Sequence, residues 1–167
     1  LTLADQDPVA GTITLVVQAL GRSTAEMHDH YHEGDSFADV VGPLGVPTEI
    51  ANLGHVVVVG GGLGVAPIFP QLRAFKQAGN RTTAIVGFRS AELAFWLDEM
   101  GAWADELIIC TDDGSMGRQG LVTEALADVV AADAPGGRPD LVVAIGPMVM
   151  MRACAETTRE SGVHTVV

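Results

Sequence analysis

Residues 55–67 read His-Val-Val-Val-Val-Gly-Gly-Gly-Leu-Gly-Val-Ala-Pro, and this stretch decides the fold. Four consecutive valines are typical of a central parallel strand covered on both faces. The glycines that follow permit a tight turn, and Pro67 fits the first turn of a helix, where its missing N–H is not needed. We therefore expect a strand at 55–59, a glycine loop at 60–64 and a helix that ends near residue 77.

Strand and helix patterns alternate through the rest of the chain. We expect further strands at 82–86, 106–110, 141–145 and 163–167, and helices at 91–100, 119–132 (stopped by Pro135-Gly136-Gly137) and 148–160. Such alternation with right-handed crossovers gives an open parallel sheet with helices on both faces. The sequence thus predicts an α/β domain at 51–167 with a five-stranded parallel sheet.

Residues 1–50 have a different pattern. They contain a β-branched stretch at 12–20, a polar helical stretch at 25–32, a second short strand at 36–41 and a Gly/Pro loop at 42–47. Short strands separated by such turns indicate part of a small β-barrel, too short here to close. The chain begins without methionine and ends in a strand that has just begun, so we expect a fragment of a longer protein.

Composition limits the partners and the compartment. The formal net charge is −12 and 48% of residues are hydrophobic. An acidic surface argues against nucleic acid and anionic membranes as partners. The two cysteines lie in or next to apolar segments and cannot form a disulfide framework, and the sequence has neither a signal-peptide pattern nor a membrane-spanning run. We expect a cytoplasmic protein.

Ligands of parallel sheets bind at the carboxyl ends of the strands, where the glycine loop lies. Its backbone N–H groups, at the start of a helix, suit an anion such as a phosphate. The loop matches neither the usual dinucleotide fingerprint nor a Walker A loop. A tight turn that serves packing alone is the alternative.

Two more loops at this edge carry polar side chains. Arg89 and Ser90 follow the second strand and provide donors suited to a phosphate, although Glu92 is near and Arg89 could simply be solvated. Asp112, Asp113, Gly114 and Ser115 follow the third strand. Paired carboxylates suggest metal or acid/base chemistry, but Asp and Ser also stabilise turns, and nothing nearby completes a metal site.

The remaining candidates are weaker. Gly146, Pro147 and Met148 open a helix at the same edge, where a flat ring could lie, while the methionines could equally fill the core. His28, His30 and His32 alternate among acidic residues, and we interpret them as a solvated segment. We predict no metal site and no catalytic acid, base or nucleophile.

Four motifs together resemble one family. They are Gly-Gly-Gly-x-Gly-x-Ala-Pro at 60–67, Gly-Phe-Arg-Ser at 87–90, Thr-Asp-Asp-Gly-Ser-x-Gly at 111–117 and Gly-Pro-x-x-Met at 146–150. In this order they resemble the ferredoxin–NADP⁺ reductase superfamily. Within it they are most similar to the electron-transfer subunit of dihydroorotate dehydrogenase and the small subunit of sulfide dehydrogenase (NADH-dependent ferredoxin:NADP⁺ oxidoreductase).

The resemblance implies two cofactor sites. Residues 1–50 would be the C-terminal part of an FAD-binding β-barrel, with Thr2 at the flavin or its ribityl chain and Gly21, Ser23 and Thr24 at the FAD pyrophosphate. Residues 51–167 would be the NAD(P)-binding domain. There the nucleotide would contact Gly60, Gly61, Gly62, Leu63, Gly64, Ala66, Pro67, Arg89, Ser90, Asp112, Asp113, Gly114, Ser115, Gly146, Pro147 and Met148.

The resemblance also implies an activity. Hydride would pass between NAD(P)H and FAD, and electrons would then leave through a [2Fe–2S] cluster beyond this chain. The receiving partner would be a larger oxidoreductase subunit, with ferredoxin as a further candidate. The alternatives are a nucleotide-binding regulatory module without turnover and an S-adenosylmethionine-dependent methyltransferase. The residues leave the choice between NADH and NADPH open.

Overall fold

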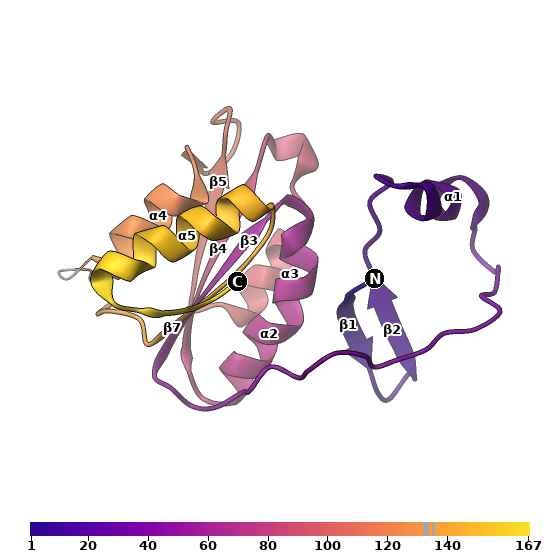
Figure 1. The fold of residues 1–167 in the computed structure, drawn as a ribbon, viewed down its shortest axis with the longest axis horizontal. Coiled ribbons are helices and arrows are strands. Elements are labelled where there is room, and N and C mark those ends of the chain that lie inside the picture. Colours follow the sequence, from indigo (N-terminus) through magenta and orange to yellow (C-terminus); the bar gives the residue numbers. More distant parts are fainter. Residues whose placement is uncertain (132–133, 135) are drawn as a thin grey trace.

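A parallel β-sheet forms the centre of the structure, which is a computed structural model that describes residues 1–131, 134 and 136–167 (Figure 1). Its strand order is β6-β5-β4-β3-β7-β8, and every neighbouring pair is parallel. The strands are β3 (His55–Gly61), β4 (Arg81–Phe88), β5 (Glu106–Thr111), β6 (Arg118–Gln119), β7 (Leu141–Ile145) and β8 (His164–Val166). The predicted α/β class is confirmed, but the sheet has six strands instead of five. The additional strand, β6, is two residues long, too short to leave a hydrophobic pattern.

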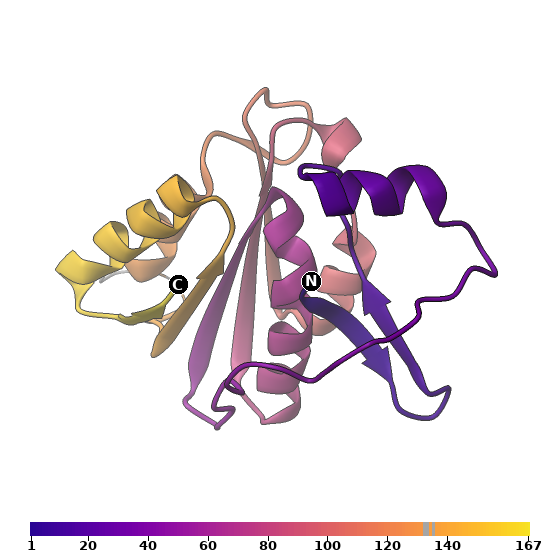
Figure 2. The same ribbon diagram turned by 45° about the vertical axis from the view of Figure 1, so that its right-hand side comes forward.

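Helices cover both faces of this sheet (Figure 2). Val56 and Val58 of β3 pack in one core cluster with residues of α2 (Val65–Gln77) and α3 (Leu97–Trp103). Val57 and Val59 face the opposite layer, α4 (Val122–Val130) and α5 (Met148–Ser161). Alternate side chains of a strand point to opposite faces, so an unbroken valine run is what a doubly covered strand requires.

Two helices differ from their predicted extents. The stretch expected as one helix at 91–100 is a short 3₁₀ helix, Ala91–Leu93, followed by α3, which begins only at Leu97. Trp96 between them has φ +57, a left-handed conformation that interrupts the helix. Helix α4 begins at Val122 instead of residue 119, because Arg118 and Gln119 pair with β5. Ala132 and Pro135, where we expected this helix to end, lie outside the described residues.

The first 54 residues form a hairpin, a helix and a long irregular segment. Strands β1 (Leu3–Asp7) and β2 (Thr12–Leu15) are antiparallel, and α1 spans Arg22–His30. The strand expected at 12–20 therefore ends early, the strand expected at 36–41 is absent, and β1 was not foreseen. Residues 36–41 are all exposed, so no sheet neighbour supports them. The hairpin lies against α2 (Figure 1), where Ala4 is almost fully buried.

The helices of the described residues are short. The longest, α5, has 14 residues, and none of these helices combines the length and apolar character needed to cross a bilayer. Since a bilayer core needs roughly 20 apolar residues in a helix, even α5 falls well below that requirement.

His55 is a buried titratable residue at the start of β3. Its Nε2 lies 2.9 Å from the Thr83 hydroxyl, while its Nδ1 finds no partner among the described residues. Burial lowers the pKa of His55 below its usual 6.5, and the charge of Arg81 lowers it further. The neutral imidazole is therefore the form that the folded protein accommodates.

This burial predicts a loss of stability in acid. The unfolded chain binds the His55 proton near pH 6.5 and the folded chain only at lower pH, so the free energy of unfolding falls as pH decreases through this window. One such proton contributes a slope of at most about 1.4 kcal/mol per pH unit. Measured by urea denaturation between pH 7 and pH 5, the free energy of unfolding should decline less steeply in His55→Gln than in the wild type. The control is His164→Gln, at an exposed histidine, which should keep the wild-type pH dependence. A His55→Gln protein with the wild-type pH dependence would show that burial of His55 does not cause the decline.

Candidate functional site

The glycine loop joins β3 to α2 through a 3₁₀ turn at Gly62–Gly64. An added Cβ on Gly64 would lie 2.1 Å from the carbonyl oxygen of Ile145, at the end of β7. One on Gly61 would lie 2.3 Å from Sδ of Met150. Gly62, by contrast, has φ +53 and open space around its Cβ position. Gly61 and Gly64 therefore serve the packing that we considered as an alternative, while Gly62 leaves its side of the loop free for a ligand.

A hollow of about 1040 Å³ lies between this loop and the first residues of the chain. The loop, the start of α2 and the ends of β4 and β7 form one wall. Residues before β1 and after β2 form the opposite wall, from Leu1 and Thr2 to Val16, Val17, Gln18 and Leu20. Cofactor sites usually measure about 300–1,000 Å³ and are mostly apolar, so this hollow is large enough for a dinucleotide.

A second hollow of about 420 Å³ adjoins the first. It shares Leu1, Val16, Gln18, Leu20 and Leu63 with the larger one and continues to the start of α1. There the Thr24 hydroxyl oxygen accepts the N–H groups of Leu20 and Gly21 at 3.1 and 3.0 Å. Thr24 is thus already engaged in capping α1. We name the two hollows together the crevice.

The predicted site residues divide into three groups. Those in the larger hollow are Thr2, Gly61, Gly62, Leu63, Gly64, Ala66, Pro67, Arg89, Gly146 and Pro147. Those in the smaller hollow are Gly21, Ser23 and Thr24, with Leu63 again. Those that line neither are Gly60, Ser90, Asp112, Asp113, Gly114, Ser115 and Met148.

The acidic loop after β5 is bound to the loop after β4. The Ser115 hydroxyl donates to Asp113 Oδ1 at 2.6 Å and accepts the Ala91 N–H at 2.7 Å. The Asp113 N–H donates to the Arg89 carbonyl at 3.3 Å. Hydrogen bonds from Ser115 lower the pKa of Asp113, so this carboxylate is held ionised in a turn. These contacts fit the turn-stabilising alternative for Asp113 and Ser115, and they fix the loop that carries Arg89.

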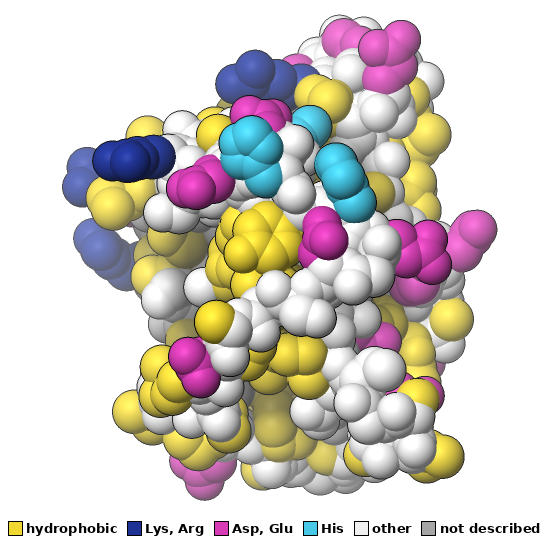
Figure 3. All heavy atoms as spheres, turned by 90° about the vertical axis from the view of Figure 1, so that its right-hand side faces the viewer, with side chains coloured by type: hydrophobic (Ala, Val, Ile, Leu, Met, Phe, Trp, Pro, Cys, Tyr) yellow, Lys and Arg dark blue, Asp and Glu magenta, His cyan; other side chains and the backbone are white. Residues whose placement is uncertain are grey.

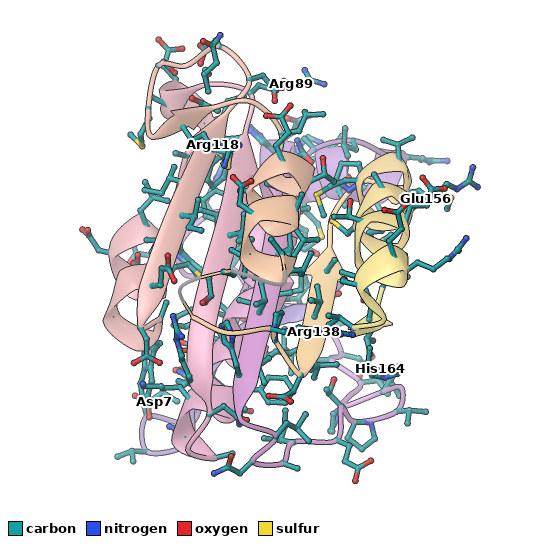
Figure 4. The ribbon with its side chains drawn as sticks, turned by 90° about the vertical axis from the view of Figure 1, so that its left-hand side faces the viewer. Asp7, Arg89, Arg118, Arg138, Glu156 and His164 are labelled. Carbon is teal, nitrogen blue, oxygen red and sulfur yellow. The ribbon has the colours of Figure 1, made fainter. Side chains whose placement is uncertain are left out.

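Arg89 is exposed at the rim of the larger hollow. Figure 4 shows it beyond the ends of the strands, among the loops, whereas Arg138 lies toward the other end of the sheet. Phe88, Leu93 and Phe95 line the same wall and were not predicted as site residues. Phe88 is part of the Gly-Phe-Arg-Ser motif, which could have indicated it, but only the fold brings Leu93 and Phe95 to the crevice.

Histidines and cysteines have no evident part in this site. His28, His30 and His32 are exposed beside acidic side chains on the face that carries α1 (Figure 3). Within the described ranges, no group of three or more His, Cys, Asp or Glu side chains is arranged to hold a metal ion. Both cysteines are buried, and burial raises the pKa of Cys154 to about 11, so it remains a protonated thiol.

The fold defines the class of protein. A scan against models of known protein families finds no match. A solved structure described as the ferredoxin reductase in carbazole 1,9a-dioxygenase superposes with a TM-score of 0.66 over 98% of this chain and 53% of its own, at 17% identity. At that identity the likeness concerns the fold alone, and it places the chain among ferredoxin reductase-type folds.

Closer relatives narrow the class. The chain is 41% identical over 163 residues to the dihydroorotate dehydrogenase B (NAD(+)) electron transfer subunit homolog of Thermotoga maritima, covering 98% of this chain and 56% of that protein. A structure of NADH-dependent reduced ferredoxin-NADP oxidoreductase superposes with a TM-score of 0.86 at 39% identity, over 98% of this chain and 57% of its own. The resemblance to the ferredoxin–NADP⁺ reductase superfamily, and within it to these electron-transfer subunits, is confirmed. The chain spans little more than half the length of these relatives.

The close packing of the glycine loop predicts that a side chain at Gly64 destabilises the protein. Gly64 has φ −60, which alanine tolerates. What opposes Gly64→Ala is the lack of space between the added Cβ and the Ile145 carbonyl. We expect a loss of about 1–3 kcal/mol in the free energy of unfolding, because the loop must move.

Gly101→Ala is the matched control. Gly101 lies in α3, where an added Cβ meets only Leu107 Cδ2 at 3.7 Å. We expect this change to stabilise the protein by about 0.5–1 kcal/mol. Urea denaturation measures both variants. A Gly64→Ala protein with wild-type stability would show that the close contact does not constrain the loop.

Proposed function

We propose that this chain carries the NAD(P)H- and FAD-binding part of an electron-transfer subunit, in which hydride passes between the two nucleotides in the crevice. The crevice supports the proposal most directly, because its opposite walls come from the two segments for which the sequence implied separate cofactors. The relatives support a redox role of this kind. We also propose the division into residues 1–50, from a flavin barrel, and 51–167.

The residues present fit a dinucleotide. The open side of Gly62 and the start of α2 offer backbone N–H groups to a pyrophosphate, and the acidic net charge of the chain does not oppose such a local site. Gly146 and Pro147 line the larger hollow at the end of β7 and carry little side chain, which would suit the flat nicotinamide ring. At the start of α1, Ser23 could donate to the pyrophosphate of FAD, and Gly21, whose N–H is bound to Thr24, would leave room for it.

The chain's part in the reaction is to bind and orient. Bound FAD would accept hydride from NAD(P)H and release the electrons one at a time. Transfer requires the two rings to be close and aligned, and opposing walls of one crevice provide that constraint. No acid or base of the chain takes part in this transfer. The electrons would then leave through a [2Fe–2S] cluster outside this chain to a larger oxidoreductase subunit, and ferredoxin is a further candidate acceptor.

Visible absorption spectroscopy under anaerobic conditions tests this function. The purified protein should show a flavin band that bleaches on addition of NADH or NADPH. A protein that binds either nucleotide but carries no flavin would instead favour a regulatory module without turnover. Calorimetric titration with FAD, NADH and NADPH distinguishes that outcome from a complete absence of binding.

The position of Arg89 predicts that this side chain contributes more to the binding of NADPH than to the binding of NADH. Its exposed guanidinium at the rim suits the 2′-phosphate of NADPH, so Arg89→Ala should weaken NADPH binding about tenfold and NADH binding by less than threefold. Glu92 is exposed close by, and Glu92→Gln should strengthen NADPH binding by removing a repulsive charge.

Arg159→Ala provides the control, because Arg159 is exposed in the last turn of α5, away from the crevice. It should leave both dissociation constants unchanged. Equal losses of NADH and NADPH in Arg89→Ala would exclude the phosphate contact.

A further inference from the structure

An ion pair joins α2 and β1, the two elements that lead into opposite walls of the crevice. Arg73 of α2 and Asp5 of β1 approach to 2.5 Å between Nη1 and Oδ1, and their side chains are only 21% and 33% exposed. Helix α2 begins beside the glycine loop, with Ala66 and Pro67 in one wall. Strand β1 begins directly after Thr2 in the opposite wall. Partial burial shields this pair from salt, so it holds more firmly than a fully exposed pair.

The local geometry of β1 is adapted to this contact. The register passes from Leu3 opposite Leu15 to Asp5 opposite Thr14, which leaves Ala4 as an extra residue. Such a bulge bends a strand and redirects its side chains. The bulge explains why two consecutive side chains both face α2. Ala4 is buried where β1 lies against this helix, and Asp5 also reaches it.

Arg73 also contacts an aromatic cluster that extends to the crevice. Its guanidinium lies 5.5 Å from the centre of the Phe69 ring, which packs edge-to-face on Trp96 at 5.4 Å. Trp96 packs on Phe95 at 6.1 Å, and Phe95 on Phe88 at 5.8 Å. Phe88 and Phe95 line the larger hollow. One side chain thus bridges the hairpin and the aromatic part of the opposite wall.

We propose that Arg73 and Asp5 form a clamp that sets the separation of the crevice walls and so positions a flavin nucleotide that contacts both. The inference rests on the proposed function for the identity of this ligand. Arg73 and Asp5 are positioning residues, because neither lines the crevice. A ligand held by the glycine-loop wall alone does not depend on the clamp.

The variant Arg73→Met tests the clamp, since it removes the charge and keeps most of the side-chain length. FAD affinity, measured by calorimetric titration of the purified protein, should fall about tenfold. ADP, which needs only the glycine-loop wall, should bind within twofold of wild type. Hydrogen exchange of the β1 and β2 amides should become about tenfold faster. Asp5→Asn should reproduce these changes, and the reversed pair Asp5→Arg with Arg73→Asp should restore part of the FAD affinity.

Lys76→Met is the matched control. Lys76 lies on the same helix and pairs with Asp105 at 2.5 Å, but both residues belong to the sheet domain, and no hairpin residue is involved. It should leave FAD affinity and hairpin exchange unchanged.

The inference is overturned if Arg73→Met leaves hairpin exchange at the wild-type rate, or if Lys76→Met causes equal losses. A wild-type protein that binds no FAD would contradict the proposed function instead. Hairpin exchange in the two variants would still decide whether the clamp exists.

Discussion

The contact between the glycine loop and the end of β7 is the constraint on which the site depends. Gly64 lies so close to the Ile145 carbonyl that no side chain fits between them. This contact is possible because the valine run of β3 is buried from both faces and hydrogen-bonded to β4 and β7, which fixes where the loop begins. The start of α2 and the Gly146–Pro147 segment are thereby brought to one edge, where parallel sheets bind their ligands.

The crevice needs a second wall, and the residues on either side of the β1–β2 hairpin provide it. Residues 1–24 contain few buried side chains, so their position depends on a small number of contacts with α2, notably Ala4 and the Asp5–Arg73 pair. We propose that the two nucleotides lie between these segments. Such an arrangement would suit hydride transfer, which requires close approach of two rings and the exclusion of water.

The sequence predicted the elements whose formation depends on their own residues. The apolar runs of β3 and β7 and the glycine after each strand are local signals, and they located the carboxyl edge and its loops. The break at Trp96, whose ring packs on Phe69 of α2, depends on a neighbour distant in sequence, and the pattern did not indicate it. Strand β6 pairs with the nearby β5, but its two residues are too few to leave a pattern. The short strand predicted at 36–41 finds no pairing partner among the described residues. The candidate site divides in the same way. The glycine loop and the Gly146–Pro147 segment line the crevice, the predicted residues 112–115 do not, and Leu93 and Phe95 reach it only through the fold.

Hydrogen exchange across the whole chain, measured with FAD and NADH added separately and together, tests most directly whether one crevice holds both groups. FAD should slow exchange at residues 18–24, NADH should slow it at 60–66, and both regions should be protected when the two ligands are present together. Protection confined to one region whichever ligand is added, or loss of one ligand's protection when the other binds, would show that one crevice does not hold both.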